Sequence, residues 1–522
     1  MPVDFRVLSY RRFTFRSENG NDPGCPSQAY QDMKMDWELI DDLCAGTQVM
    51  RDRAEIWLPR EQFESIPNYK ARLKRSFLFP ALKDTIDKVV SRPFSQPVSL
   101  VKAEDLDDRL VAMVDDMDGE DTDLTSHART AFEIMVAYGK VHVYVDFAAT
   151  GGSQNAAEDK QLTPVCRIIS PHDLIGWRSE TGPNGKRRLT QIRFRYWENE
   201  PAGTYGDKDV EYLLVVNAPT IDGASGTWSR HKLSTDSGKY EKVDEGTHTY
   251  PGIPLVTAYA RKKGYLKCEP PLMDLAHLNL AHWQSASDQR NALRFARIGM
   301  FAATGITPDE YDKTTTLAPT NMFKSISKDA KYYHVEHSGA AIAAGQEEVK
   351  HLEEQMEVVG SAPFIHRSAS STATGKQIDA EASSTDVKAW VRIGELLWKT
   401  VFKVAATWIK VELPESFGVN IFDDYTITGS QADNEFLLKC RTAGELSRGT
   451  FLSEVKRRGT IAESVDVDEE TAAIESEGPS FAQQLDQAKL DAARQMGNKP
   501  DLNQDDPNQG DSPMNSGGSQ GQ

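Results

Sequence analysis

Cysteine is scarce in this chain, and its pattern excludes two classes of protein. Five cysteines are spread over 522 residues, and no two stand in a Cys-x-x-Cys arrangement. A disulfide-rich secreted fold and a zinc site of paired cysteines are therefore not expected. The dispersed, odd-numbered set predicts reduced thiols and assembly in a reducing cytoplasm. A signal peptide is not expected either, because the N-terminal stretch MPVDFRVLSYRRF lacks an apolar core.

Sequence signatures of catalysis are also lacking. The chain contains neither a Gly-x-Ser-x-Gly elbow nor a His-Glu-x-x-His motif. The Thr-Gly-Lys tripeptide at 374–376 resembles the end of a phosphate-binding loop. Ser370, however, stands where that motif needs its first glycine, and Gln377 stands where it needs a hydroxyl group. We therefore expect no enzyme activity and no cofactor.

Metal ligands do not converge in the sequence. Asp274, His277 and His282 fall on one predicted helix, but His282 follows His277 by five residues and so points to another side. A metal site needs three or four convergent ligands, and we expect none here. The adjacent aspartates at 41–42 and 115–116 are interpreted as solvated surface charges.

Positive charge is in deficit, since 60 lysines and arginines face 78 acidic residues and the net charge is −18. Thirteen acidic and three basic residues lie between Ile461 and the C-terminus, so this stretch carries −10 of that charge. A chain this acidic does not hold nucleic acid by broad neutralisation of phosphates. If it meets DNA, the DNA is expected to slide. The composition of 478–522 predicts a largely disordered acidic and polar tail.

Long apolar runs are missing too. The most apolar helix is predicted at 377–413, where Pro414 stops it, and it is interrupted by Lys403 and Lys410. It does not reach the ~20 apolar residues that a bilayer span requires. No membrane segment is therefore expected.

What the chain does contain is an ordered series of elements between Pro270 and Leu413. A helix at 271–298 is followed by a small β-rich insert at 299–345, an acidic helix at 346–360, a polar loop at 361–376 and the helix at 377–413. That last helix would be about 55 Å long at ~1.5 Å per residue. Such a length suits a strut in an assembly.

The helix at 377–413 carries a seam of apolar side chains at helical spacing. The seam is Trp390, Ile393, Leu397, Val401, Val404, Trp408 and Val411. An amphipathic helix lying on the core of its own domain is the simpler interpretation of this seam, and a strut between copies is the alternative.

The first 270 residues predict an α+β region. Helices are expected to end near Gly46, to break at Pro80, and to run over 106–117 and 124–138, the last closed by Gly139. Strands are expected from 141 to 260, with glycine-containing turns between them. After Pro414, a short strand and a helix over 432–459 are expected.

The loop at 361–376 combines hydroxyl groups with a few cations. Its candidate DNA-contacting residues are His366, Arg367, Ser370, Ser371, Thr372 and Lys376. Hydroxyl and cationic groups suit brief contacts with a phosphate backbone. A flexible linker is the alternative interpretation. The acidic helix before the loop has the opposite character, with Glu347, Glu348, Glu353, Glu354 and Glu357 against one lysine.

Four stretches give this order of elements a family resemblance. They are LKRSFLFPALKDTIDKVVSRPF, AYGKVHVYVDF, PLMDLAHLNLAHWQSASDQRNALRFARIGMFAATGI, and LEEQMEVVGSAPFI with TATGKQID. Together they resemble the portal proteins of tailed bacteriophages, the head-to-tail connector family. The third stretch carries the matching residues Leu275, Ala276, Leu278, Asn279, His282, Trp283, Ser287 and Asp288. The chain departs from the family at Lys376-Gln377, where an acidic residue often stands, and no catalytic motif is carried over.

The resemblance implies an α+β portal fold with wing, stem, clip and crown, in a ring of twelve subunits around a DNA channel. The implied parts are the wing (1–270), the first stem helix (271–298), the clip (299–345), the second stem helix (346–360), the channel loop (361–376), the long wing helix (377–413), the crown (414–477) and the tail (478–522). The five glutamates of the second stem helix would form a channel wall that repels phosphates.

The implied partners are those of a portal vertex in a virion assembled in the cytoplasm of a bacterial host. They are other copies of the chain, the major capsid protein with any scaffold, the terminase packaging motor, head-tail adaptor or tail proteins, and double-stranded DNA that passes through with weak contacts and without sequence preference. Two other functions stay open, namely a different phage structural or adaptor protein and an enzyme with an unrecognised site.

Overall fold

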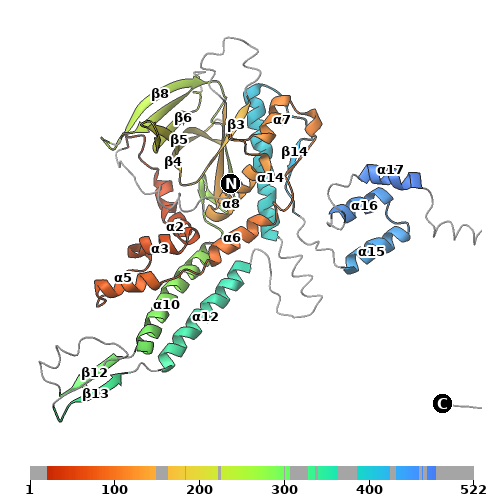
Figure 1. Cartoon of the computed structure of the whole chain (residues 1–522). Helices are drawn as coiled ribbons and strands as arrows, with labels where there is room; N and C mark the ends of the chain where they lie inside the picture. Colours follow the sequence, from red (N-terminus) through yellow and green to blue (C-terminus); the bar gives the residue numbers. More distant parts are fainter. Residues whose placement is uncertain are drawn as a thin grey trace, which may run out of the picture. The chain divides into compact units, whose positions relative to one another are not determined.

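The chain divides into two units, Met1–Thr426 and Ile427–Gln522, shown in the computed structural model of Figure 1. The structure describes residues 20–147, 163–182, 184–220, 225–234, 236–298, 300–305, 327–335, 339–361, 385–423, 431–457, 461 and 467–477. Helices and sheets are segregated along the first unit, which confirms the predicted α+β class. The predicted division into wing, stem, clip and crown stays a prediction.

Seven helices are described in the N-terminal part of the first unit. They are α2 (Gln28–Ala45), α3 (Thr47–Asp52), α4 (Ala54–Trp57), α5 (Ile66–Arg75), α6 (Ala81–Ser91), α7 (Asp108–Asp115) and α8 (Leu124–Tyr138). The predicted break at Pro80 separates α5 from α6. Gly139 ends α8 with φ of 85°, and a side chain there would meet the Glu269 carbonyl oxygen at 2.3 Å. Only glycine meets both demands.

Two antiparallel sheets follow. The three-stranded sheet has the order β3-β2-β9, and the five-stranded sheet has the order β4-β5-β6-β7-β8. Their strands are β2 (Lys140–Phe147), β3 (Pro164–Ile169), β4 (Leu174–Thr181), β5 (Arg187–Ala202), β6 (Gly206–Asn217), β7 (Gly226–Leu233), β8 (Tyr240–His248) and β9 (Leu255–Tyr259). Two small ribbons pair β1 (Ser99–Val101) with β14 (Gly418–Asn420) and β10 (Lys262–Gly264) with β11 (Lys267–Cys268).

The aspartates at 41–42 are buried, which corrects their interpretation as solvated charges. Asp41 accepts a hydrogen bond from Tyr138 at 2.6 Å, and Asp42 accepts one from the Trp57 indole at 2.6 Å. Arg53 adds an ion pair to Asp42 at 2.9 Å. These partners hold α2 against α4 and α8, and burying a carboxylate is possible because each is paired.

A helical hairpin projects from this part of the chain. Its arms are α10 (Met273–Ile298) and α12 (Gly339–Ser361), and its tip is an antiparallel ribbon of β12 (Met300–Thr304) and β13 (Lys331–Val335) (Figure 1). The second arm begins at Gly339 and not at 346 as predicted. The Gln289 amide donates a hydrogen bond to the Ile342 carbonyl at 2.8 Å, and the alanines of this stretch favour a helix.

Helix α14 (Thr385–Ile409) lies on the core of the first unit, as the simpler interpretation of its apolar seam predicted. Its buried face also includes Val387, Val391, Trp398, Phe402, Ala405 and Ile409. The helix ends four residues before the predicted Leu413. Lys410 has φ of 57°, and Val411 N–H donates to the Ala406 carbonyl at 3.0 Å, so a left-handed cap ends it ahead of Pro414. Its predicted start at 377 lies outside the described residues.

The second unit contains α15 (Gln431–Thr442), α16 (Arg448–Arg457) and α17 (Val467–Glu477). The single helix predicted over 432–459 is therefore two helices. Gly444, with φ of 81°, stands in the turn between them. The tail predicted to be disordered, 478–522, lies outside the described residues.

Candidate functional site: the root of the helical hairpin

The residues of α10 that carry the family resemblance gather where the hairpin leaves the N-terminal helices. Leu275, Ala276 and Trp283 are fully buried against the core. Their spacing of one, seven and eight residues places them on one face of a helix. This face attaches the hairpin to α2 and α6, so the motif acts first as an anchor.

Asn279 caps a helix to which it does not belong. Helix α6 begins after Pro80, whose side chain makes no capping hydrogen bond. The Asn279 carbonyl oxygen accepts from Leu82 N–H at 3.1 Å, and its amide donates to the Phe79 carbonyl at 2.8 Å. One side chain thereby satisfies a first-turn N–H of α6 and the loop carbonyl that precedes it. The cap is completely buried.

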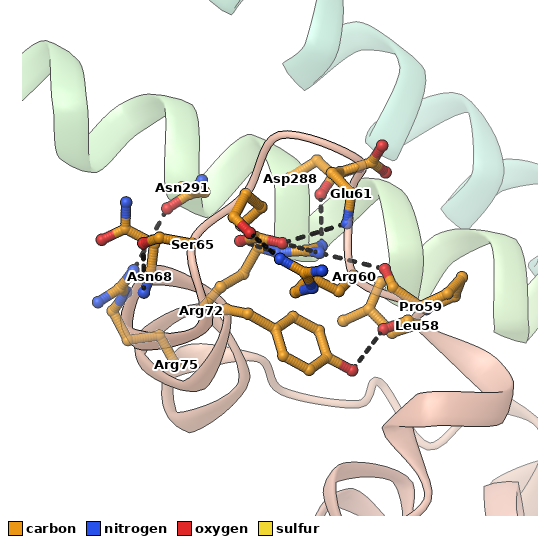
Figure 2. A network of polar contacts seen from close by, with 12 residues as sticks. Leu58, Pro59, Arg60, Glu61, Ser65, Asn68, Arg72, Arg75, Asp288 and Asn291 are labelled. Carbon is orange, nitrogen blue, oxygen red and sulfur yellow. Dashed lines mark hydrogen bonds and ion pairs between the residues drawn. The ribbon is translucent and has the colours of Figure 1, made fainter.

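Arg72 ties α5 and its preceding loop to α10 (Figure 2). Its guanidinium donates to both oxygens of Glu64 at 3.0 and 2.8 Å and to Asp288 at 2.9 Å. Burial opposes the charge of Arg72, but the hydrogen bonds and charge of Glu64 outweigh it and raise the pKa of Arg72. The forked geometry fixes the helices in orientation as well as distance.

Further contacts at the root run from side chains of α10 to backbone carbonyls of the segment before α6. Gln284 donates to the Trp57 carbonyl at 2.7 Å, and Arg290 donates to the Arg75 carbonyl at 3.3 Å. Arg75 in turn donates to the side chain of Asn291 at 3.3 Å (Figure 2). The root is therefore held along several turns of α10.

Polar contacts also join the two arms. His282 lies 3.2 Å from Glu353, and Ser285 donates to Glu348 at 3.3 Å. The Phe79 ring packs on the His282 ring with centroids 5.6 Å apart. Two of the five predicted channel-wall glutamates are thus turned toward α10.

The other three glutamates, Glu347, Glu354 and Glu357, are exposed on α12. Lys350 lies 3.7 Å from Glu354, an exposed pair one turn apart on the helix. Whether this surface faces a channel stays a prediction. The candidate DNA-contacting residues His366, Arg367, Ser370, Ser371, Thr372 and Lys376 lie outside the described residues.

The three candidate metal ligands do not come together. Asp274 and His277 are exposed, whereas His282 is buried beside Glu353. Within the described ranges, no group of three or more histidine, cysteine or acidic side chains is placed to hold a metal ion. In the same part of the chain, no helix is long and apolar enough to cross a membrane.

Sequence reasoning missed Arg72 and the capping role of Asn279. Arg72 stands in a basic stretch, Lys-Ala-Arg-Leu-Lys-Arg, and the sequence does not indicate which of its cations is buried. Asn279 offered a better signal, since it is a polar residue one turn beyond Leu275 and Ala276 on an apolar face. A polar side chain on a buried face needs a partner.

Comparison with known proteins matches part of the chain. Residues 271–409, which include the hairpin and α14, match a family model described as a domain of unknown function, DUF4055. No curated protein matches the chain.

Solved structures similar to the chain include two titled as particle necks. One is from "Neck of empty GTA particle computed with C6 symmetry", with 10% identity, a TM-score of 0.38, and coverage of 77% of this chain and 95% of the other. The second is from "Neck of native GTA particle computed with C12 symmetry", with 9% identity, a TM-score of 0.36, and coverage of 72% and 88%. TM-scores at this level do not establish a shared fold.

Proposed function

We propose that this chain is the portal protein of a tailed bacteriophage or a phage-like particle. Twelve copies would form a ring at one vertex of the capsid, through which the genome enters during packaging and leaves at ejection. The role is architectural, with no catalytic step and no cofactor. The terminase motor, the major capsid protein with any scaffold, and adaptor or tail proteins would dock on the ring.

One observation carries the proposal: a helical hairpin, rooted in an α+β unit, ends in a two-stranded ribbon. The paired residues run from Met300–Val335 to Thr304–Lys331. A ribbon of two strands is not independently stable and exposes unpaired edges. The hairpin is therefore suited to being completed by neighbouring copies.

The acidic surface of α12 is consistent with the same role. Glutamates facing a channel would repel phosphates and so let DNA pass without sticking. The loop at 361–376 would make weak contacts with that DNA. Lys140, His142 and the other buried titratable groups of the sheets lie in the core and are assigned no part in function.

The proposal predicts a ring with an axial hole in negative-stain images of the purified chain. A matched variant tests the ribbon directly. Removing residues 302–333 and joining Phe301 to His334, which face each other in the ribbon, by an Asn-Gly turn keeps the root and both arms intact. We expect this variant to stay folded and to lose the ring.

Images without rings, or rings unaffected by the shortened ribbon, would contradict the proposal. A different phage adaptor protein would also form rings, so a second measurement separates the two. Capsid shells assembled with the chain should contain one ring each and package DNA when the terminase is supplied. A ring that joins only shells already filled with DNA would identify an adaptor.

A further inference from the structure

The two arms of the hairpin expose charges of opposite sign on different faces. On α10, Arg290, Arg294 and Arg297 are exposed and follow one another at spacings of four and three residues. They therefore share one face of the helix. On α12, the exposed face carries Glu347, Glu354 and Glu357 with a single lysine. The net charges of the two faces are complementary.

The basic face continues into exposed aromatic side chains. Phe77 and Phe79 are 51% and 44% exposed, and the Arg290 guanidinium lies 5.6 Å from the centroid of the Phe77 ring. We call Phe77, Phe79, Arg290, Arg294 and Arg297 the aromatic–basic flank. The face of α12 has its own exposed apolar residue, Val358, at 43%. Aromatic and arginine side chains are the types enriched in protein interfaces.

In the part of the chain that the structure describes, one ion pair neutralises a charge of these surfaces, that of Lys350 with Glu354. Among the described residues, no ion pair is formed by Arg294, Arg297, Glu347 or Glu357. Partial burial lowers the pKa of Arg75, and the nearby Arg294 lowers it further. Helices α5 and α12 lie on opposite sides of α10 (Figure 1).

We infer that the aromatic–basic flank of one copy binds the exposed glutamate face of α12 of a second copy. The contact is heterologous, joining two different surfaces, and repetition of such a contact closes a ring when the rotation between copies permits it. Because α10 and α12 are antiparallel and Ser285 meets Glu348, Arg290 and Glu347 differ by four residues, about 6 Å, in their level along the hairpin. This inference rests on the ring of the proposed function and assigns its contact surfaces. It places Glu347, Glu354 and Glu357 between copies, and so replaces the channel-facing role proposed above for these three glutamates.

Charge reversal tests the contact, because both partners are present in every copy. The flank is reversed by Arg294→Glu with Arg297→Glu, and the α12 face by Glu347→Lys with Glu354→Lys. Each pair alone should weaken association by roughly tenfold to a hundredfold, because like charges then face each other. The four changes together should restore the ring. Lys208→Glu, exposed on β6, with Lys239→Glu, exposed in the turn between β7 and β8, is the matched control and should leave the ring unchanged.

Native mass spectrometry gives the distribution of assemblies, and circular dichroism checks that every variant is folded. Rings of wild-type mass from either reversed pair, or a fourfold variant that stays monomeric, would overturn the inference and leave the proposed function standing. Absence of rings from the wild-type chain would instead overturn the proposed function. If reversal of the flank lowers affinity for double-stranded DNA while the ring mass is unchanged, the flank is a DNA contact and the inference is wrong.

Discussion

Arg72 and Asp288 form an ion pair of 2.9 Å across 216 residues of sequence, yet the two side chains are unequally exposed. The Arg72 side chain is 3% exposed and that of Asp288 is 63% exposed. The solvated carboxylate contributes little to stability, whereas the buried guanidinium depends on its other partner, Glu64, for compensation. The two ends of this contact should therefore respond very differently to substitution.

Replacing Arg72 with methionine keeps the side-chain length and removes the charge. We expect Arg72→Met to lower the free energy of unfolding by roughly 2–4 kcal/mol, since Glu64 loses its partner. Asp288→Asn should cost less than about 1 kcal/mol. Chemical denaturation measures both. The exposed Lys88, paired with Asp84, supplies a control as Lys88→Ala. Equal losses for Arg72→Met and Asp288→Asn would show that the burial argument is wrong.

Asn279 should be one of the most sensitive polar positions of the hairpin. Asn279→Ala removes the cap of α6 and leaves two buried backbone groups without partners, at a cost of about 2 kcal/mol or more. Asn279→Asp keeps an acceptor for Leu82 N–H but turns a carboxylate oxygen toward the Phe79 carbonyl oxygen in a fully buried site, so its loss should be at least as large. Thermal unfolding followed by circular dichroism gives the order. A loss well below ~1 kcal/mol for Asn279→Ala would contradict the capping role.

Lys140 gives the fold a defined pH dependence. Its ammonium group is fully buried, donates to the Leu266 carbonyl at 2.8 Å, and lies 5.2 and 5.1 Å from the ring centroids of Trp37 and Trp177. Burial is the main cause that lowers the pKa of Lys140 from 10.5 to about 8. The unfolded chain therefore binds more protons at this residue between pH 8 and 10.5, and its contribution to stability rises with pH over that window.

The buried thiols oppose this trend above pH 9, because burial raises the pKa of Cys268 to about 11. Comparing the wild-type chain with Lys140→Met separates the contribution of the lysine from that of the thiols, because the thiols are the same in both. We expect the free energy of unfolding of the wild-type chain to rise relative to that of Lys140→Met as pH increases from 8 to 10. Urea denaturation at several pH values measures the difference. A constant difference over that range would mean that Lys140 keeps its ordinary pKa.

The loop at 361–376 is predicted to touch DNA through Arg367 and Lys376. Each cation that contacts a phosphate releases about one counterion, so the contacts should be weak and sensitive to salt. Arg367→Ala with Lys376→Ala should leave folding and the ring unchanged and alter the amount or retention of DNA in assembled heads. Agarose electrophoresis of extracted DNA gives its length. If heads with the double variant package and hold full-length DNA as the parent does, Arg367 and Lys376 do not contact DNA and the loop is only a linker.

A truncation tests whether the C-terminal tail is needed for ring assembly. Ending the chain at Asn498 removes residues whose composition predicts disorder. Rings of the truncated chain should have the same subunit number by native mass spectrometry. Loss of the ring would show that the tail is structural.

Local signals predicted much of the fold. Gly139 as the end of α8, the break at Pro80 and the period-two strands all depend on neighbouring residues, and each was found where the sequence placed it. The start of α12 was misplaced for a local reason as well. Gly345 was interpreted as a boundary, but contacts from Gln289 and a run of alanines extend the helix through it.

Long-range partners account for what the sequence did not predict. The aspartates at 41–42 are buried because Arg53, Trp57 and Tyr138 pack over them. The residues next to the aspartates in the sequence do not predict these partners. The role of Asn279 likewise depends on Leu82, 197 residues earlier. Hydrogen bonds between distant segments are fixed by packing, which periodicity does not encode.

The contacts from α10 to backbone carbonyls have a consequence for tolerance to substitution. Asn279, Gln284 and Arg290 each donate to a main-chain oxygen, at Phe79, Trp57 and Arg75 respectively. Every amino acid supplies that oxygen, so the receiving positions can change identity without losing the bond as long as their backbone path is kept. The donors have no such freedom. Random mutagenesis should therefore find the donors on α10 restrictive and the receiving positions 75 and 79 more permissive, whereas Trp57 is also held by its hydrogen bond to Asp42.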